Sequence, residues 1–436
     1  MKLFLPLAAL LLASTPAAAK LSSQESRMVR VVEQERDRTI SLLERMVNQN
    51  SGTRNLAGVE AVGSMMRAEL EPLGFLVRWV PMAEVGSAGH IVAVHRGNGR
   101  GKKLLLIGHL DTVFEADSPF QKFVRKGDEA EGPGAGDNKG GMAVMVAALR
   151  AMHQAGTLDQ ADIEIVLTGD EEQAGRPTAI SRRDLVEAGK RADVALDFEG
   201  LAQMNGQDMG SIARRSSGSW KVKATSNSGH SSGIFSESAG NGAIYELARI
   251  LEAFRTQLRE PNLTYNVGMV VGGATASLDA AAIRGQATGK TNIIPPVAIA
   301  TGDMRALSRD QIARVQARMR EIAAESLPGT RAEISFEEDP YPPMAPTEGA
   351  RALLGRLNLV NADLGLARMG ELDPIRRGAG DIAFVAADVD GLVGLGAASR
   401  GDHGPGETVD LVSLDRQAKR AAILMTRLSR EKRTSR

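Results

Sequence analysis

Histidine and carboxylate side chains that could bind metal recur along this chain, mostly at the ends of apolar segments. They are His109, Asp137, Glu172, Glu199 and His403. The chain has 6 His and no Cys in 436 residues, so a zinc site here must be built from imidazole and carboxylate ligands. Such ligands are typical of catalytic zinc sites, which keep an open position, whereas closed structural sites favour Cys. The composition therefore indicates a catalytic metal centre.

The local surroundings of two of these residues favour metal binding. Asp111 follows His109 by two positions on a segment expected to be extended, which places both side chains on one face. A carboxylate in that position commonly fixes the tautomer of a ligating imidazole. Asp137 lies in the glycine-rich segment Gly134–Gly141, which is also good turn chemistry, so a turn without metal is the alternative there.

The two glutamate positions leave different alternatives open. Asp170, Glu171 and Glu172 are three consecutive acids with no compensating cation nearby in the sequence, which favours a metal over a solvated acidic cap. Asp197 lies two residues before Glu199, on the same face of an extended segment. Asp197 is therefore the alternative ligand to Glu199.

The first residues predict an export signal. Lys2 gives a positive start, residues 3–13 are apolar, and a run of alanines ends at Ala19 before Lys20. This pattern indicates a secretory signal peptide over residues 1–19, cleaved after Ala19. Pro16 argues against a buried N-terminal helix, and no later apolar run reaches the ~18 residues of a membrane span. We expect an exported protein, located in the periplasm or secreted, and its lack of Cys fits that route.

Charge and aromatic content exclude several partners. Lys plus Arg and Asp plus Glu both total 53, so no basic surface is indicated for nucleic acid or for anionic membranes. Aromatic residues make up 3% of the chain, too few to predict stacking platforms for bases or sugars. The length exceeds that of one ordinary hydrophobic core, and two domains are expected.

The elements that must position the candidate ligands alternate between helices and strands. Helical periodicity covers residues 24–71 and 141–152, and apolar strands are predicted at residues 76–80, 91–94, 104–107, 163–168 and 194–198. This alternation predicts an α/β fold with an open, mostly parallel sheet. Sites in such folds lie at the carboxyl ends of the strands, where the candidate ligands occur.

A segment of different character interrupts this pattern. Strands are predicted at 220–224, 263–271, 298–305 and 332–336, with helices at 241–258 and 310–326. The order βαββαβ predicts a ferredoxin-like insertion. We expect a catalytic domain in two parts, residues 20–213 and 341–436, around an inserted domain at 214–340. Arg214 and Arg215 are interpreted as a solvated hinge face.

The final segment returns to the first pattern. A helix is predicted at 349–359, a strand at 391–395 and a closing helix at 412–428. The basic tail from Ser429 is expected to fray.

In their order and spacing, these motifs resemble the co-catalytic zinc exopeptidases and deacylases. That family includes glutamate carboxypeptidase, aminoacylase and succinyl-diaminopimelate desuccinylase. The resemblance covers essentially the whole mature chain and is nearest to the secreted glutamate-carboxypeptidase type. It implies that His109 and Glu199 hold one zinc, that Glu172 and His403 hold a second, and that Asp137 bridges both.

The same resemblance assigns roles beyond the ligands. It implies that Asp111 orients His109 and that Glu171 is the general base. Each of two Zn²⁺ ions then has three protein contacts and an open position for a shared water, as in hydrolases whose ions lie ~3.5–4 Å apart. Co²⁺ or Mn²⁺ could occupy the same N/O sites.

The inserted domain supplies further candidates by resemblance. His230 matches a histidine that, in dimeric relatives, reaches the partner subunit's active site and stabilises the tetrahedral oxyanion, which implies a homodimer. Asn292, Arg305 and Gly380 match positions that bind substrate, and a guanidinium suits a carboxylate. Two segments depart from glutamate carboxypeptidases, namely residues 338–343 and the residue before Asp381, and they leave the accepted amino acid open.

The sequence thus predicts an exported, zinc-dependent carboxypeptidase that hydrolyses an amide to release a C-terminal amino acid. An N-acyl-amino-acid deacylase is the alternative, since it would use the same metal residues. A metal-bearing binding protein without turnover is the alternative from another class, and the presence of Glu171 favours an enzyme.

Overall fold

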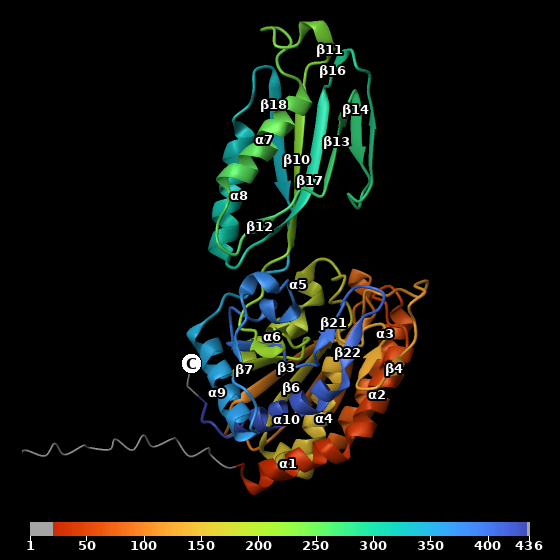
Figure 1. Cartoon of the computed structure of the whole chain (residues 1–436), viewed down its shortest axis with the longest axis vertical. Helices are drawn as coiled ribbons and strands as arrows, with labels where there is room; N and C mark the ends of the chain where they lie inside the picture. The colour runs from red at the N-terminus through yellow and green to blue at the C-terminus, as the bar shows by residue number, and fades with distance from the viewer. Residues whose placement is uncertain (1–20, 434–436) are drawn as a thin grey trace, which may run out of the picture.

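The computed structural model describes residues 21–433, which form a larger and a smaller body (Figure 1). The predicted signal peptide lies outside these residues and stays a prediction. Among the described helices, none combines the length and apolar character that a membrane crossing requires.

A mixed sheet with six strands among the described residues forms the centre of the larger body. Its order is β1-β2-β6-β3-β7-β20, and β6, β3, β7 and β20 are parallel neighbours. β2 pairs antiparallel with β6, and β1 pairs antiparallel with β2. The prediction of an open, mostly parallel sheet is confirmed. β3 is central because Leu104 to Ile107 are all buried, as a continuous apolar run predicts. The bounds are β1 Leu76–Pro81, β2 Gly89–His95, β3 Lys103–His109, β6 Asp162–Thr168, β7 Val194–Asp197 and β20 Gly391–Val393.

Helices cover both faces of this sheet. On one face, α1, α2, α4 and α10 pack together, and their apolar side chains form the main core with the sheet. On the other face, α6 packs over β6 and β3 around a smaller core. The bounds are α1 Ser23–Gln34, α2 Arg36–Asn48, α3 Leu56–Leu70, α4 Lys139–Gln154, α5 Thr178–Ser181, α6 Arg183–Arg191, α9 Glu348–Asp363 and α10 Leu411–Leu428.

Short strands complete the larger body at its rim. They are β4 Val124–Lys126, β5 Glu129–Glu131, β8 Gln203–Met204, β9 Gln207–Gly210, β19 Gly370–Glu371, β21 Ser399–Arg400 and β22 Thr408–Asp410. Of these, β21 and β22 flank the loop that carries His403.

The smaller body is the predicted insertion. The antiparallel order β13-β17-β10-β18, with α7 and α8 against it, is the ferredoxin-like arrangement expected from βαββαβ. Trp220 and Phe254 meet edge to face in its core, at 5.7 Å between ring centroids. The bounds are β10 Gly218–Ser226, α7 Ala243–Gln257, β12 Thr264–Tyr265, β13 Met269–Gly273, β17 Val297–Arg305, α8 Arg309–Ala324 and β18 Thr330–Phe336, with the outer ribbons β11 Gly229–His230, β14 Thr275–Leu278, β15 Gly285–Thr288 and β16 Ile293–Ile294.

Two predictions of local structure were wrong. The strand expected over 263–271 is interrupted at Asn266, where Gly302 of β17 approaches so closely that an added Cβ would lie 1.7 Å from the Asn266 carbonyl oxygen. The basic tail was expected to fray from Ser429, but it is held against the larger body as far as Arg433. Its Glu431 carboxylate pairs with Lys102 at 2.7 Å and with Arg356 at 2.6 Å.

Candidate active site

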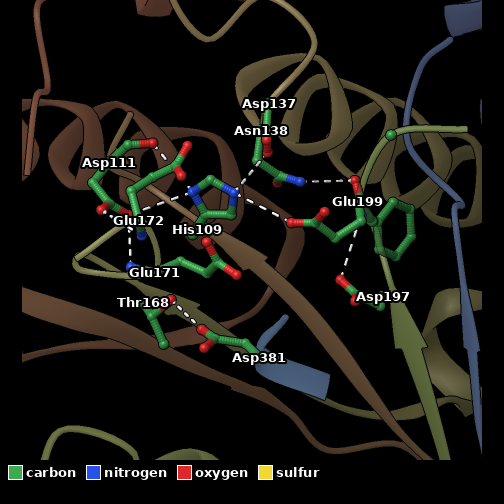
Figure 2. Close-up of polar contacts among 12 residues, drawn as sticks. His109, Asp111, Asp137, Asn138, Thr168, Glu171, Glu172, Asp197, Glu199 and Asp381 are labelled. Atoms are coloured by element: carbon green, nitrogen blue, oxygen red, sulfur yellow. Dashed lines mark hydrogen bonds and ion pairs between the residues drawn. The ribbon is translucent and has the colours of Figure 1, made fainter. Parts of the chain in front are cut away.

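Neighbouring strand ends bring the candidate ligands together. His109 is the last residue of β3, while Glu171 and Glu172 follow β6, and Glu199 follows β7. β6, β3 and β7 are parallel neighbours, so their carboxyl ends meet at one edge of the sheet. Asp137 joins them from the loop before α4. Figure 2 shows the His109 ring between these carboxylates.

The side chains form two groups that share Asp137. In the first group, His109 Nε2 lies 3.0 Å from Asp137 Oδ1 and 3.3 Å from Glu199 Oε1. In the second, His403 Nε2 lies 3.0 Å from Asp137 Oδ2 and 3.2 Å from Glu172 Oε2. Each oxygen of one carboxylate thus faces a different imidazole, which is the arrangement of a bridge between two cations.

Glu199 rather than Asp197 reaches this centre. Asp197 is buried on the preceding strand, and its Oδ1 accepts the Glu199 backbone N–H at 3.3 Å. The geometry therefore favours Glu199 as the ligand, with Asp197 behind it. Burial raises the pKa of Asp197 well above its ordinary value, and the Glu199 charge adds to the effect.

Asp111 organises the groups next to the ligands. The Nδ1 atom of His109 lies 3.1 Å from the Asp111 carbonyl oxygen and 3.4 Å from its Oδ1. The Asp111 carboxylate also accepts the backbone N–H groups of Glu171 at 3.0 Å and Glu172 at 3.1 Å, and the Thr53 hydroxyl at 2.7 Å. One fully buried carboxylate therefore fixes a ligand ring and the peptides of both glutamates.

Glu407 holds the glycine-rich loop, a role that the sequence interpretation missed. Its Oε1 accepts the backbone N–H of Gly136 at 2.7 Å and of Asp137 at 3.0 Å, and its Oε2 accepts that of Gly134 at 3.2 Å. Glu407 is fully buried. A carboxylate four residues after His403, among glycines, is the signal that could have indicated this role.

The interpretation of Arg214 and Arg215 as a solvated hinge face was wrong, because both side chains are buried. Arg214 Nη1 binds Glu199 Oε2 at 3.0 Å, on the oxygen that does not face His109. Arg215 donates to the Thr264 hydroxyl at 2.6 Å and to the Ile375 carbonyl at 3.0 Å. The pattern of neighbours in sequence could not reveal these partners, because each lies at least 15 residues away.

The charges in this centre suit bound cations. One ligand atom each from His109, Asp137 and Glu172 lie within 4.8 Å of one another. Burial, followed by the Asp137 and Glu171 charges, raises the pKa of Glu172 to about 11. Its Oε1 is buried and has no hydrogen-bond partner among residues 21–433. Divalent cations would relieve this crowding, and the N/O donor set fits zinc and similar metals.

Burial alone would lower the pKa of His109, but hydrogen bonds to Asp111, Asp137 and Glu199 raise it well above its ordinary value. The neighbouring carboxylates thus favour a positive charge at the His109 ring, as Arg214 provides at Glu199. A metal held by the same carboxylates would replace that charge and leave the ring neutral for ligation.

A cavity of about 410 Å³ opens beside the candidate ligands. Arg305 at the end of β17 lines it, and its guanidinium pairs with Asp303 at 3.2 Å, which is the plain alternative for that residue. Arg376 and Arg377 line the same cavity. A larger groove of about 720 Å³ lies at the other edge of the sheet, where β1 and β6 begin and β2 ends. None of the candidate ligands lines this groove.

Gly380 lies against Arg214 in a tight arrangement. A Cβ on Gly380 would lie 2.3 Å from Arg214 Nη2, and the neighbouring Ala379 carbonyl accepts Arg214 Nε–H at 2.9 Å. The missing side chain at this position thus lets the guanidinium reach Glu199.

His230 and Asn292 lie far from this centre within one chain. His230 is on β11, paired with Ile293 of β16, and the Ser231 N–H donates to the Asn292 carbonyl at 3.0 Å. Figure 1 shows β11 and β16 at the end of the smaller body farthest from the sheet. The structure therefore brings His230 and Asn292 together and separates both from Arg305, at the other end of β17. Their predicted roles need a second chain and stay predictions.

A family model described as Peptidase family M20/M25/M40 matches residues 105–428, which include all five candidate ligands. The chain belongs to this family. Its relatives include carboxypeptidase G2 of Pseudomonas sp. (strain RS-16), 30% identical over 304 residues, covering 69% of this chain and 66% of the relative. Another is the succinyl-diaminopimelate desuccinylase of Novosphingobium aromaticivorans, 30% identical over 198 residues, covering 44% and 51% respectively. The matches thus span from about half to nearly two thirds of these curated relatives.

Solved structures share the fold of this M20/M25/M40 member. A tripeptidase from Staphylococcus aureus aligns with a TM-score of 0.69 at 18% identity, over 91% of this chain and 99% of its own. The YXEP protein of Bacillus subtilis, described as a dinuclear metal binding peptidase from the M20 family, aligns with a TM-score of 0.64 at 17% identity, over 91% and 99%. At these identities the likeness shows the fold alone.

The family assignment confirms the resemblance seen in the sequence. It places the chain in a family of metal-dependent hydrolases that act on amide bonds.

Proposed function

We propose that this protein is an exported di-zinc carboxypeptidase that hydrolyses an amide bond and releases a C-terminal amino acid. The observation that carries the proposal is the shared Asp137 carboxylate, with one oxygen facing His109 and the other facing His403, both at 3.0 Å. The first zinc would be held by His109, Asp137 and Glu199, and the second by Glu172, His403 and Asp137. Bound metal would supply Lewis-acid chemistry, lowering the pKa of water and polarising the amide carbonyl.

Glu171 supplies the proton-transfer step. Its carboxylate lines the cavity and has no hydrogen-bond or ion-pair partner among the described residues. It is therefore free to accept the proton of the attacking water and to deliver it to the leaving nitrogen. Burial raises the pKa of Glu171 well above its ordinary value, and bound cations would lower it again, so that the ionised carboxylate could accept a proton and then hold it until the leaving nitrogen takes it.

The cavity also offers cations for the carboxylate of the released residue. Arg305 lines it from the inserted domain at 214–340, and Arg376 lines it from the catalytic domain. A guanidinium binds a carboxylate through two parallel hydrogen bonds. We assign Arg305 to this carboxylate, with Gly380 shaping the pocket through Arg214. Asn292 and His230 would act from the partner subunit of a homodimer formed through the inserted domain.

The second candidate is an N-acyl-amino-acid deacylase, favoured by the similarity to desuccinylases. It would use the same metal residues and differ only in which side of the amide fills the cavity. A protein that binds metal without turnover is the remaining alternative.

The test is hydrolysis of N-acyl amino acids, N-benzoyl amino acids and dipeptides, each as the free acid and as the C-terminal carboxamide. Wild type with restored zinc is compared with Glu171→Gln. The matched control is Glu187→Gln, which makes the same change on the exposed face of α6. We expect turnover of free acids by wild type and Glu187→Gln, and a loss of at least ~100-fold in Glu171→Gln.

The outcomes separate the candidates. Cleavage of dipeptide free acids supports the carboxypeptidase, and cleavage confined to N-acyl amino acids supports the deacylase. No turnover with two zinc ions bound per chain supports the binding protein. No bound zinc would refute the ligand assignment itself.

Export and dimerisation have separate tests. A mature N-terminus at Lys20 in the exported fraction supports the signal peptide, and retention of residues 1–19 contradicts it. Light scattering that gives the mass of one chain contradicts the homodimer and, with it, the roles of His230 and Asn292.

A further inference from the structure

Two chain segments connect the catalytic body with the inserted domain, and they pair with each other. Arg214 and Met344 exchange backbone hydrogen bonds at 3.0 and 2.9 Å, and Ser217 and Tyr341 do so at 3.2 and 2.9 Å. The connection is thus a short two-stranded ladder. Its side chains include Arg214, which binds Glu199, and Tyr341, which reaches the peptide of Glu171.

The hydrogen-bond direction at Tyr341 is fixed by its partners. Arg182 Nη2 lies 2.8 Å from the Tyr341 hydroxyl oxygen, and a guanidinium can only donate. The single Tyr341 hydroxyl hydrogen therefore donates to its other neighbour, the Glu171 carbonyl oxygen, at 2.8 Å. Arg182 itself is fully buried and held by Asp170 at 2.5 Å and by Asp381 at 2.7 Å.

The Glu171 peptide is consequently held on both sides. Its N–H donates to Asp111, which lies just after β3, and its C=O accepts from Tyr341, which belongs to the returning segment. The Glu171 carboxylate has no such restraint among the described residues, so its position depends on this peptide.

Further contacts seat the returning segment on the loop that follows Glu172. Glu337 pairs with Arg176 at 2.5 Å, and Asp339 accepts the Thr178 backbone N–H at 2.5 Å and also its hydroxyl. The Tyr341 ring meets Phe384 edge to face at 5.0 Å. The segment that closes the inserted domain is therefore bound directly to the loop that carries the general base.

We propose that Tyr341 is a positioning residue for Glu171, and that its hydroxyl transmits the seating of the inserted domain to the general base. The proposal rests on the assignment of Glu171 as the base in the proposed function. It predicts that removing one hydroxyl, with every metal ligand intact, slows the chemical step.

The test is Tyr341→Phe in the full, zinc-loaded chain. Phenylalanine keeps the ring contact with Phe384, and Arg182 Nη2 keeps its bond to the Asp170 carbonyl at 3.0 Å, so the Glu171 carbonyl is the group that loses its partner. The matched control is Tyr265→Phe, because the Tyr265 hydroxyl also donates to a backbone carbonyl, that of Phe254, at 2.8 Å inside the inserted domain.

Three quantities are measured for each variant: kcat and KM, zinc bound per chain, and hydrogen exchange of a peptide covering residues 168–176. For Tyr341→Phe we expect kcat to fall on the order of tenfold with KM within about twofold, since the base acts only in the transition state. Zinc content stays at the wild-type value, and exchange over 168–176 becomes faster. Tyr265→Phe changes none of these.

The proposal is overturned if Tyr341→Phe keeps kcat within about twofold of wild type, since a lost positioning contact costs more than that. It is also overturned if the variant loses zinc, or if exchange over 168–176 is unchanged or equally fast in Tyr265→Phe. If wild type hydrolyses no substrate, the proposed function fails, and the exchange comparison alone decides whether Tyr341 restrains Glu171.

Discussion

Glu407 offers a direct test of how the glycine-rich loop supports the metal centre. Replacement by Ala leaves three buried N–H groups, those of Gly134, Gly136 and Asp137, without their acceptor. Each unpaired donor costs about 1–3 kcal/mol, and with partial relaxation we expect a loss of roughly 3–5 kcal/mol in unfolding free energy. Replacement by Gln is milder, because one oxygen can keep the two bonds that Oε1 now accepts.

The same two variants should weaken metal binding in graded fashion. Loss of groups that support ligands typically costs 10–100-fold in metal affinity, so we expect about tenfold for Glu407→Gln and about 100-fold for Glu407→Ala. Competition with a zinc chelator measures the affinity, and urea unfolding of the metal-free protein measures the stability. The control is Asp193→Asn, which alters a carboxylate that accepts the Lys103 backbone N–H at 2.8 Å, at the opposite end of β3 from His109.

Three results would contradict these expectations for Glu407. Wild-type zinc affinity in Glu407→Ala would show that the loop holds Asp137 without Glu407. Equal losses in Gln and Ala would show that charge, rather than the count of hydrogen bonds, carries the effect. A similar loss of affinity in Asp193→Asn would show a general effect of destabilisation.

Two further predictions concern Arg214 and Asp208. Gly380→Ala should displace Arg214 from Glu199, because the added Cβ meets the guanidinium at 2.3 Å, and kcat/KM should fall on the order of tenfold. The control is Gly355→Ala, which has open space around the added Cβ. Equal activity in both variants would contradict the prediction. Burial opposes ionisation of Asp208, but hydrogen bonds from Gln203 and Arg420, with the charges of Arg420 and Arg416, hold its pKa below the ordinary value. Its stabilisation is therefore complete above the unfolded pKa of about 3.9 and lost as pH falls below it. Asp208→Asn should cost roughly 3 kcal/mol at pH 7, and the cost should shrink as pH falls below about 3.9 and through the lower folded pKa, measured by urea unfolding. A cost independent of pH would contradict the assignment.

The clustering of the candidate ligands could be predicted because their signals are local. His109, Glu172 and Glu199 each follow an apolar strand within a few residues, and the strands themselves are continuous runs that lie centrally in the sheet. Parallel pairing then brings the three ends together without further information. The βαββαβ order of the inserted domain was visible for the same reason, as a sequence of local periodicities.

The supporting residues could not be predicted because their partners lie far away in sequence. Arg214 was interpreted as solvated from its charge alone, although Glu199, with which it pairs, neutralises it inside the protein. Glu431 in the tail pairs with Lys102, 329 residues earlier, and no local pattern announces that contact. His230 and Asn292 lie at the far end of the insertion within one chain. The role expected for His230 acts on the partner subunit's active site, so the fold of a single chain leaves it a prediction.

The bridge between Asp137 and His403 spans 266 residues, with the whole inserted domain between them. At ~5–20 residues per second, a ribosome makes His403 roughly 15–50 seconds after Asp137. Strand β20, which completes the sheet beside β7, also follows the insertion. During synthesis the chain therefore holds four of its five candidate ligands before His403 is made, and under the proposed function the second zinc would lack its imidazole ligand until the chain is nearly finished. Metal ions would therefore bind in the compartment where the chain completes its folding. The ions available in that compartment, as much as the ligand set, would determine which metal the finished protein carries.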